Sequence, residues 1–269
     1  MKFRKNRVYD AFFISDVHYL VDKKIKNHHH KELFQLLDFF IKRNIRFRKV
    51  ILAGDIIENW FFSAARKYRQ KQKRFDKLFD RLDCISAKRG SKYYIIGNHD
   101  TTSFSMQLPP DIKQYLQKRY YLITGHYEDR NLIVVHGHQG QYTQITWVLH
   151  IAIVRLFHSL AFLIPRLFYF AEDFYDRHLN RVDPVTPEQK LAYYRRLSQH
   201  VHQKNKVLIA GHTHDFLCLP ELKMMNTGDW VKNRSFIIRK SGTYYGMRLL
   251  KRKAIQLEFS WTDPDWRDS

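Results

Sequence analysis

Five short apolar runs in this chain each end in side chains of the types that bind metal ions. The runs are residues 12–15, 50–53, 93–96, 132–135 and 207–210, and they lead into Asp-Val-His, Gly-Asp, Gly-Asn-His-Asp, His-Gly-His and Gly-His-Thr-His, respectively. A continuous apolar run bounded by glycine or polar residues is typical of a strand buried on both faces. Ligands gather outside the carboxyl ends of such strands. The pattern therefore predicts an α/β fold with one site at the strand ends.

The tetrapeptide Gly97, Asn98, His99 and Asp100 combines three kinds of functional group at one strand end: a carboxamide, an imidazole and a carboxylate. Its carboxamide can bind a metal ion through the carbonyl oxygen, its imidazole can donate a proton, and its carboxylate can orient the imidazole. A Gly-Asn turn is also common punctuation after a strand. For any single run, a core histidine or a capping aspartate is the ordinary explanation. Five such ends in one chain favour a shared metal site.

The order of these motifs resembles that of the calcineurin-like metallophosphoesterase family, from Asp16 to His214. The resemblance implies that His99 is the proton donor, that Asp100 orients it, and that Asp55 bridges two metal ions. It implies the following ligands: Asp16, His18, Asp55 and His214 for one ion, and Asp55, Asn98, His136 and His212 for the other.

The resemblance also implies a fold of two packed mixed β-sheets flanked by helices. We expect residues 1–139 and 206–269 to form the catalytic domain and residues 140–205 to form an inserted helical lid. Short apolar runs after His214 predict an antiparallel meander that closes the second sheet. Of the three residues that follow Asp55 at a short distance, Glu58, Asn59 and Trp60, we predict that only Asn59 and Trp60 form a wall of the substrate pocket.

The expected lid contains residues 145–164, of which 15 in 20 are apolar. This length would admit a transmembrane helix. A single crossing, however, would place His136 and His212, assigned to one metal ion, on opposite sides of a bilayer. Arg155 in the middle of the segment adds a cost of about 3 kcal/mol to insertion. We expect the segment to cover the site and to lie at a membrane interface.

The formal net charge is 47 minus 26, or +21. Such an excess of Lys and Arg indicates either an ordinary solvated surface or attraction to a polyanion. The polyanion would be an anionic membrane surface or nucleic acid, and charge alone does not choose between these two. Cys84 and Cys218 are the only cysteines, which indicates a reducing compartment. The first residues lack the apolar segment of a secretory signal. We therefore expect a cytoplasmic protein that associates with the inner face of the cell membrane.

Mixed Asp, His and Asn ligands suit Mn²⁺, Zn²⁺ or Fe²⁺ better than Ca²⁺ or Mg²⁺, and we expect two ions, with Mn²⁺ favoured. Two such ions predict hydrolysis of a phosphate ester or anhydride. Within the family, the chain most resembles the branch that cleaves UDP-2,3-diacylglucosamine to UMP and an acyl-sugar phosphate in lipid A biosynthesis. The likeness lies in residues 54–60, in the apolar insertion and in residues 226–230, although the best-known members have Arg where this chain has His99 and Asp where it has His138.

Two other classes of function remain open from the sequence. A nuclease or a cyclic-nucleotide phosphodiesterase is favoured by the positive charge and disfavoured by the apolar insertion. A scaffold with an inactive site is disfavoured because every expected ligand position is filled. A lipid-linked or nucleotide-containing phosphate is therefore the expected substrate, and an anionic membrane is a more strongly favoured partner than nucleic acid.

Overall fold

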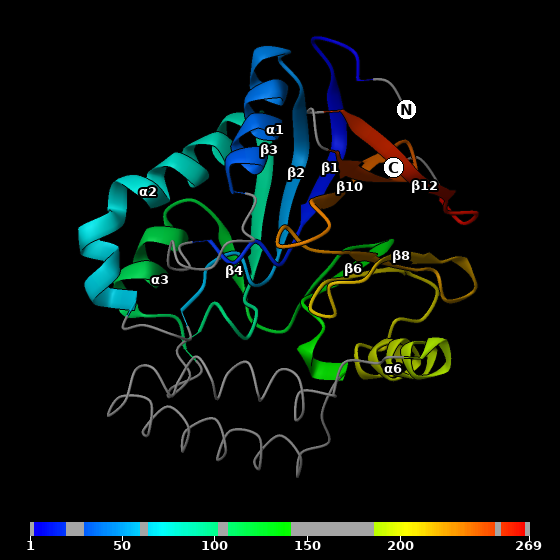
Figure 1. Cartoon of the computed structure of the whole chain (residues 1–269). Coiled ribbons are helices and arrows are strands. Elements are labelled where there is room, and N and C mark those ends of the chain that lie inside the picture. Colours follow the sequence, from blue (N-terminus) through cyan, green and yellow to red (C-terminus); the bar gives the residue numbers. More distant parts are fainter. Residues whose placement is uncertain are drawn as a thin grey trace.

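Two β-sheets pack face to face in the computed structural model, and helices cover their outer faces (Figure 1). The structure describes residues 3–19, 30–59, 64–101, 107–140, 186–250 and 254–266. This architecture confirms the predicted α/β class with two mixed sheets.

The larger sheet has seven strands in the order β12-β11-β10-β1-β2-β3-β4. Four strands are parallel to one another, and three strands from the end of the chain are antiparallel to their neighbours. Their bounds are β1 (Val8–Ile14), β2 (Arg46–Ala53), β3 (Ser86–Ile95), β4 (Tyr121–Ile123), β10 (Ser235–Lys240), β11 (Thr243–Leu249) and β12 (Ile255–Thr262). The three runs 12–15, 50–53 and 93–96 thus form the carboxyl ends of β1, β2 and β3, as predicted.

The smaller sheet has five strands in the order β5-β6-β7-β9-β8, with a parallel centre and antiparallel edges. Its members are β5 (His126–Glu128), β6 (Leu132–Val135), β7 (Val207–Ala210), β8 (Phe216–Leu219) and β9 (Met224–Thr227). The predicted runs at 132–135 and 207–210 coincide with β6 and β7. Because β1, β2, β6 and β7 all end at the same side of the sandwich, their following loops can meet there.

Alternating side chains of β1 and β2 divide the core into layers. Phe12 and Val50 face the helices α1 (His30–Lys42), α2 (Ala64–Ile85) and α3 (Pro110–Gln117), whereas Phe13 and Ile51 face the second sheet. A third layer lies between the outer face of the smaller sheet and α6 (Pro187–His200), which packs Tyr193, Tyr194 and Leu197 against it. Two short 3₁₀ helices, η1 (His138–Gly140) and η3 (Pro220–Leu222), follow β6 and β8. The core therefore holds the strand ends that carry the site in fixed positions.

The strands after His214 do not all close the second sheet, so that part of the prediction is wrong. Only β8 and β9 join it, whereas β10 pairs antiparallel with β1 and extends the larger sheet. Five of the six residues of β10 are buried, because both of its faces meet a hydrophobic layer. A strand that is apolar on both faces can enter either sheet, and the local pattern does not specify its neighbour.

Residues 141–185, which contain the apolar segment 145–164, lie outside the described residues. The described remainder of the predicted lid, residues 186–205, contributes α6, whose Thr186 forms a capping box with Gln189. Among the described residues, no helix is long and apolar enough to cross a membrane.

Candidate metal centre

Most of the expected ligands have a backbone conformation that residues other than glycine rarely adopt. Positive φ angles occur at Asp16 (50°), His18 (47°), Asp55 (53°), His212 (71°) and His214 (58°). Left-handed conformations cost free energy, and when the surrounding structure holds them they are characteristic of active sites and ligand clamps. The loops after β1, β2 and β7 therefore hold these five side chains in imposed, sharply turned positions.

Asp16, His18 and His214 form a first cluster, in which one ligand atom of each residue lies within 4.8 Å of the others. The Nε2 atom of His214 is 3.3 Å from Oδ1 of Asp16. Asp16 is fully buried. This cluster takes two residues from the loop after β1 and one from the loop after β7, so it joins the two sheets.

The His18 imidazole supplies a direct test of whether a metal ion suits the first cluster. Its Nδ1 atom donates to Oε2 of Glu58 at 2.8 Å. Its Nε2 atom is buried and has no hydrogen-bond partner. Burial of an unpaired polar atom is costly, and a histidine that binds a metal ion typically donates its other ring N–H to a carboxylate, as His18 does here. The residues present therefore fit a metal ion.

Asp55, His136 and His212 form a second cluster, which the side chain of Asn98 joins. Nδ1 of His136 lies 3.0 Å from the carbonyl oxygen of Ala53, so it carries the proton in a neutral ring. Nε2 of the same ring lies 3.0 Å from Oδ2 of Asp55 and 3.0 Å from Oδ1 of Asn98. Three electron-rich atoms thus converge, and they need either a proton or a metal ion among them.

The pKa values express the same demand for positive charge. Burial lowers the pKa of His136, but the carboxylate of Asp55 outweighs this effect and raises it to about 9. Burial raises the pKa of Asp55, yet the neighbouring His136 and His99 hold it well below its usual value. His212, in contrast, has its pKa lowered by burial and by His136, so it offers a neutral imidazole. Neutral imidazoles and ionised carboxylates are the forms that bind metal ions.

Taken together, the two clusters contain all seven expected ligands. The donors are carboxylate, carboxamide and imidazole groups, a set that suits Mn²⁺, Zn²⁺ or Fe²⁺. Both carboxylate oxygens of Asp55 have contacts: Oδ1 accepts the backbone N–H of His99 at 2.7 Å, and Oδ2 lies 3.0 Å from Nε2 of His136. Its bridging of two ions stays a prediction.

Asp100 does not have the predicted role of orienting His99. Its two carboxylate oxygens accept four hydrogen bonds, from the backbone N–H groups of Asp55, Ile57 and Gly97 and from the hydroxyl of Tyr94, at 2.6 to 2.9 Å. Four donors occupy the lone pairs of a carboxylate, so none is left for an imidazole. Asp100 instead ties the loop after β2 to the loop after β3. The prediction for this residue was wrong because sequence spacing indicates which residues are close to Asp100, but not which hydrogen-bond donors occupy its carboxylate oxygens.

Glu58 has the role that was assigned to Asp100. Its Oε2 atom accepts from Nδ1 of His99 at 2.9 Å and from Nδ1 of His18 at 2.8 Å. Burial raises the pKa of Glu58, but His99 and His18 together lower it to about 2, so it is ionised. Burial lowers the pKa of His99, and Glu58 and Asp55 raise it to about 10. One carboxylate therefore orients both a candidate ligand and the candidate proton donor.

Asn59 and Trp60, and not Glu58, are the residues predicted to form the wall of the substrate pocket. Asn59 is 2% exposed, its side chain donates to the carbonyl of Asp100, and its backbone N–H donates to the carbonyl of His99. It therefore positions the loop that carries His99, while its contact with substrate stays a prediction. Trp60 lies outside the described residues. The signal that could have identified Glu58 is its charge, because a buried carboxylate close to several histidines needs them as partners.

A polar network holds the loop between His212 and His214. The side chain of Asn226 donates to the carbonyl of Gly211 at 2.8 Å and to the hydroxyls of Thr213 and Tyr194, both at 3.1 Å. The hydroxyls of Tyr194 and Thr213 are themselves 2.9 Å apart. Through this network, α6 contacts the loop that carries two of the expected ligands.

No family model and no curated protein matches the sequence. A predicted phosphoesterase from Streptococcus pneumoniae has 10% identity, with 94% of this chain and 95% of that chain covered and a TM-score of 0.41. A dimetal phosphatase from Danio rerio has 12% identity, with 95% and 99% covered and a TM-score of 0.47. Both TM-scores are below 0.5, so the case for a function depends on the site itself.

Proposed function

We propose that this chain is a dinuclear-metal phosphoesterase or pyrophosphatase, which hydrolyses a phosphate ester or anhydride. The observation that carries the proposal is the convergence of Asp55, Asn98 and His136 on one point, beside a second cluster with the unpaired Nε2 atom of His18. Two adjacent sites of this composition are typical of phosphoryl-transfer chemistry with two metal ions. Mn²⁺ is the ion we favour.

The side chains divide the chemical work as follows. Bound divalent ions would supply Lewis acidity toward the phosphoryl oxygens and toward water. His99 holds a proton, because Glu58 binds its Nδ1–H and raises its pKa, and we assign to His99 the protonation of the leaving oxygen. Glu58 and Asp100 act on position only: the first orients His99, and the second fixes the loops on which Asp55 and His99 lie.

The substrate that we propose is a lipid-linked diphosphate such as UDP-2,3-diacylglucosamine, cleaved to UMP and an acyl-sugar phosphate. Its support is the sequence likeness at residues 54–60 and 226–230 and the apolar character of residues 145–164. A nuclease or cyclic-nucleotide phosphodiesterase is the second candidate, and the observation that favours it is the net charge of +21. An inactive scaffold is disfavoured because all seven expected ligands lie in the two clusters.

Hydrolysis of bis-p-nitrophenyl phosphate tests the proposed activity without any assumption about lipid. We expect the protein loaded with Mn²⁺ to release p-nitrophenol and the protein stripped by a chelator to lose this activity, because neither the imidazoles nor the carboxylates alone polarise the phosphoryl group. Readdition of Mn²⁺ should restore the rate. The scaffold would be supported instead if the protein is folded, as shown by a cooperative thermal transition, and yet is inactive with Mn²⁺, Zn²⁺ and Fe²⁺.

We propose that the excess of positive charge binds anionic membranes in preference to nucleic acid, and this defines a second test. We expect the protein to co-sediment with vesicles that contain about 30% phosphatidylglycerol and to be released at 1 M salt, where the Debye length falls to about 3 Å. Vesicles of phosphatidylcholine alone are the control. Duplex DNA should be neither retained at physiological salt nor cut. If the Mn²⁺-loaded protein degrades DNA and the Asp55→Asn variant does not, a nuclease becomes the favoured function.

A further inference from the structure

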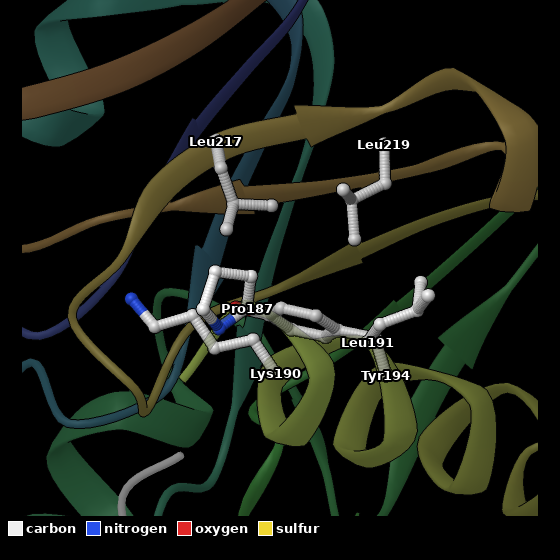
Figure 2. Close-up of a pocket in the computed structure, with 6 residues that line it drawn as sticks. All are labelled: Pro187, Lys190, Leu191, Tyr194, Leu217 and Leu219. Atoms are coloured by element: carbon white, nitrogen blue, oxygen red, sulfur yellow. The ribbon is translucent and has the colours of Figure 1, made fainter. Parts of the chain in front are cut away.

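A groove of about 250 Å³ lies between α6 and the edge strand β8 (Figure 2). Leu217 and Leu219 point from β8 toward the helix, and the facing wall is formed by Pro187, Leu191 and the ring of Tyr194. Drug-sized ligands occupy pockets of about 300 to 1,000 Å³, so this groove suits one narrow apolar chain better than a nucleoside.

Among the described residues that line the groove, Lys190 is the charged one, and its Nζ atom binds Oδ1 of Asp215 at 2.6 Å. Asp215 directly follows the expected ligand His214. At its base, Tyr194 turns its hydroxyl toward Thr213, which lies between His212 and His214. The groove therefore adjoins the loop that carries His212 and His214, and its lining at Leu191 and Leu219 is apolar.

We propose that this groove binds one alkyl or acyl chain of a phosphorylated amphiphile whose phosphate lies at the metal centre. The lining of the groove favours this occupant. The anionic head of such a ligand would lie at the metal centre, and its unbranched apolar tail would lie against the leucine side chains of the groove. The inference rests on the proposed function, because the metal centre holds the head group. It adds a chain-binding site whose described lining residues come from α6 and β8.

Binding of non-hydrolysable alkylphosphonates to the Mn²⁺-loaded protein tests this site by calorimetry. Each methylene buried in the groove should raise affinity about fourfold, which corresponds to about 0.8 kcal/mol. We therefore expect octylphosphonate to bind at least tenfold more tightly than butylphosphonate, and the gain to level off once the groove is full. Equal affinity for all chain lengths in the wild-type protein would overturn the proposal.

Variants that fill the groove test whether the dependence of affinity on chain length arises there. Leu219→Trp and Leu191→Trp, from opposite walls and both only partly buried, should remove the dependence on chain length. Ala192→Trp places the same side chain on an exposed position of α6 and should retain it. If both groove variants keep the wild-type melting temperature and also keep the dependence, the chain binds elsewhere and the proposal fails.

A labelling experiment on the unmodified chain covers the case in which the tryptophan variants do not fold. An octylphosphonate with a diazirine at the end of its chain should label residues 187–194 or 216–219, identified by mass spectrometry, and label at other positions would contradict the proposal. Hydrolysis of bis-p-nitrophenyl phosphate separates the two hypotheses. If the protein is active but its affinity for phosphonates does not depend on chain length, only the groove proposal is wrong. If affinity depends on chain length and the groove is labelled but the protein is inactive, only the proposed function is wrong.

Discussion

Asp55→Asn should lower kcat/KM for bis-p-nitrophenyl phosphate by about 10³-fold or more. The carboxylate supplies a negative charge that both clusters are predicted to share, and its loss removes several kcal/mol of charge stabilisation, with each 1.4 kcal/mol worth a factor of ten. Asparagine has the same shape and keeps an oxygen that can accept the N–H of His99, so the loop should persist. Metal content, measured by mass spectrometry after dialysis, should fall from two ions per chain.

The matched control is Asp38→Asn, which removes a carboxylate that pairs with Arg81 at 2.8 Å on the helical face of the molecule. This variant should keep both ions and the wild-type rate, since a partly exposed ion pair contributes little. A variant at Asp55 that retained two ions and full activity would show that it does not bridge them. Turnover by the wild-type protein after exhaustive chelation would show that hydrolysis does not require metal ions.

His99→Ala should separate proton donation from metal binding. We expect turnover to fall about 10²- to 10⁴-fold, the usual contribution of general acid catalysis, while metal content stays at the wild-type value. The effect should be smaller for a substrate whose leaving group is a strong acid, because such a leaving oxygen needs no proton. His126→Ala, which removes an exposed imidazole on β5, is the control and should leave both quantities unchanged.

Glu58→Gln gives a second measurement on the same hydrogen bonds. Because Glu58 binds both His18 and His99, its loss should reduce metal affinity as well as rate, each by about 10- to 100-fold. His99→Ala should affect the rate alone. If metal content instead fell in step with the rate in His99→Ala, His99 would be a ligand, an arrangement that the grouping of His18, Glu58 and His99 within 4.8 Å also permits.

The strand ends were predictable because their signal is local. An apolar run followed by glycine, aspartate or histidine defines a buried strand and its exit loop, and parallel strands place such loops at one edge; β6 and β7 accordingly begin and end at the predicted residues. The grouping of Asp16 with His214, which are 198 positions apart and lie on loops of different sheets, was instead predicted from the resemblance in motif order.

Two kinds of feature could not be predicted in this way. The roles of Glu58 and Asp100 depend on which donor lies within 3 Å of each oxygen, a property of the folded loops that residue spacing does not encode. The place of β10 beside β1 depends on competition between two open sheet edges, and a strand buried on both faces suits either. Both errors concern partners that are distant in sequence.

Each cluster in the site draws its ligands from both sheets, and this has a thermodynamic consequence. Asp16 and Asp55 lie on loops of the larger sheet, whereas His136 and His214 lie on loops of the smaller one. A bound ion is therefore a cross-link between the two halves of the sandwich, and its binding free energy becomes part of the free energy of unfolding. At a free ion concentration 100 times the dissociation constant, one such site adds about 2.7 kcal/mol. Depletion of metal would then loosen the sandwich first along the edge at which the loops meet, and the hydrogen exchange of β6 and β7 would report on metal supply.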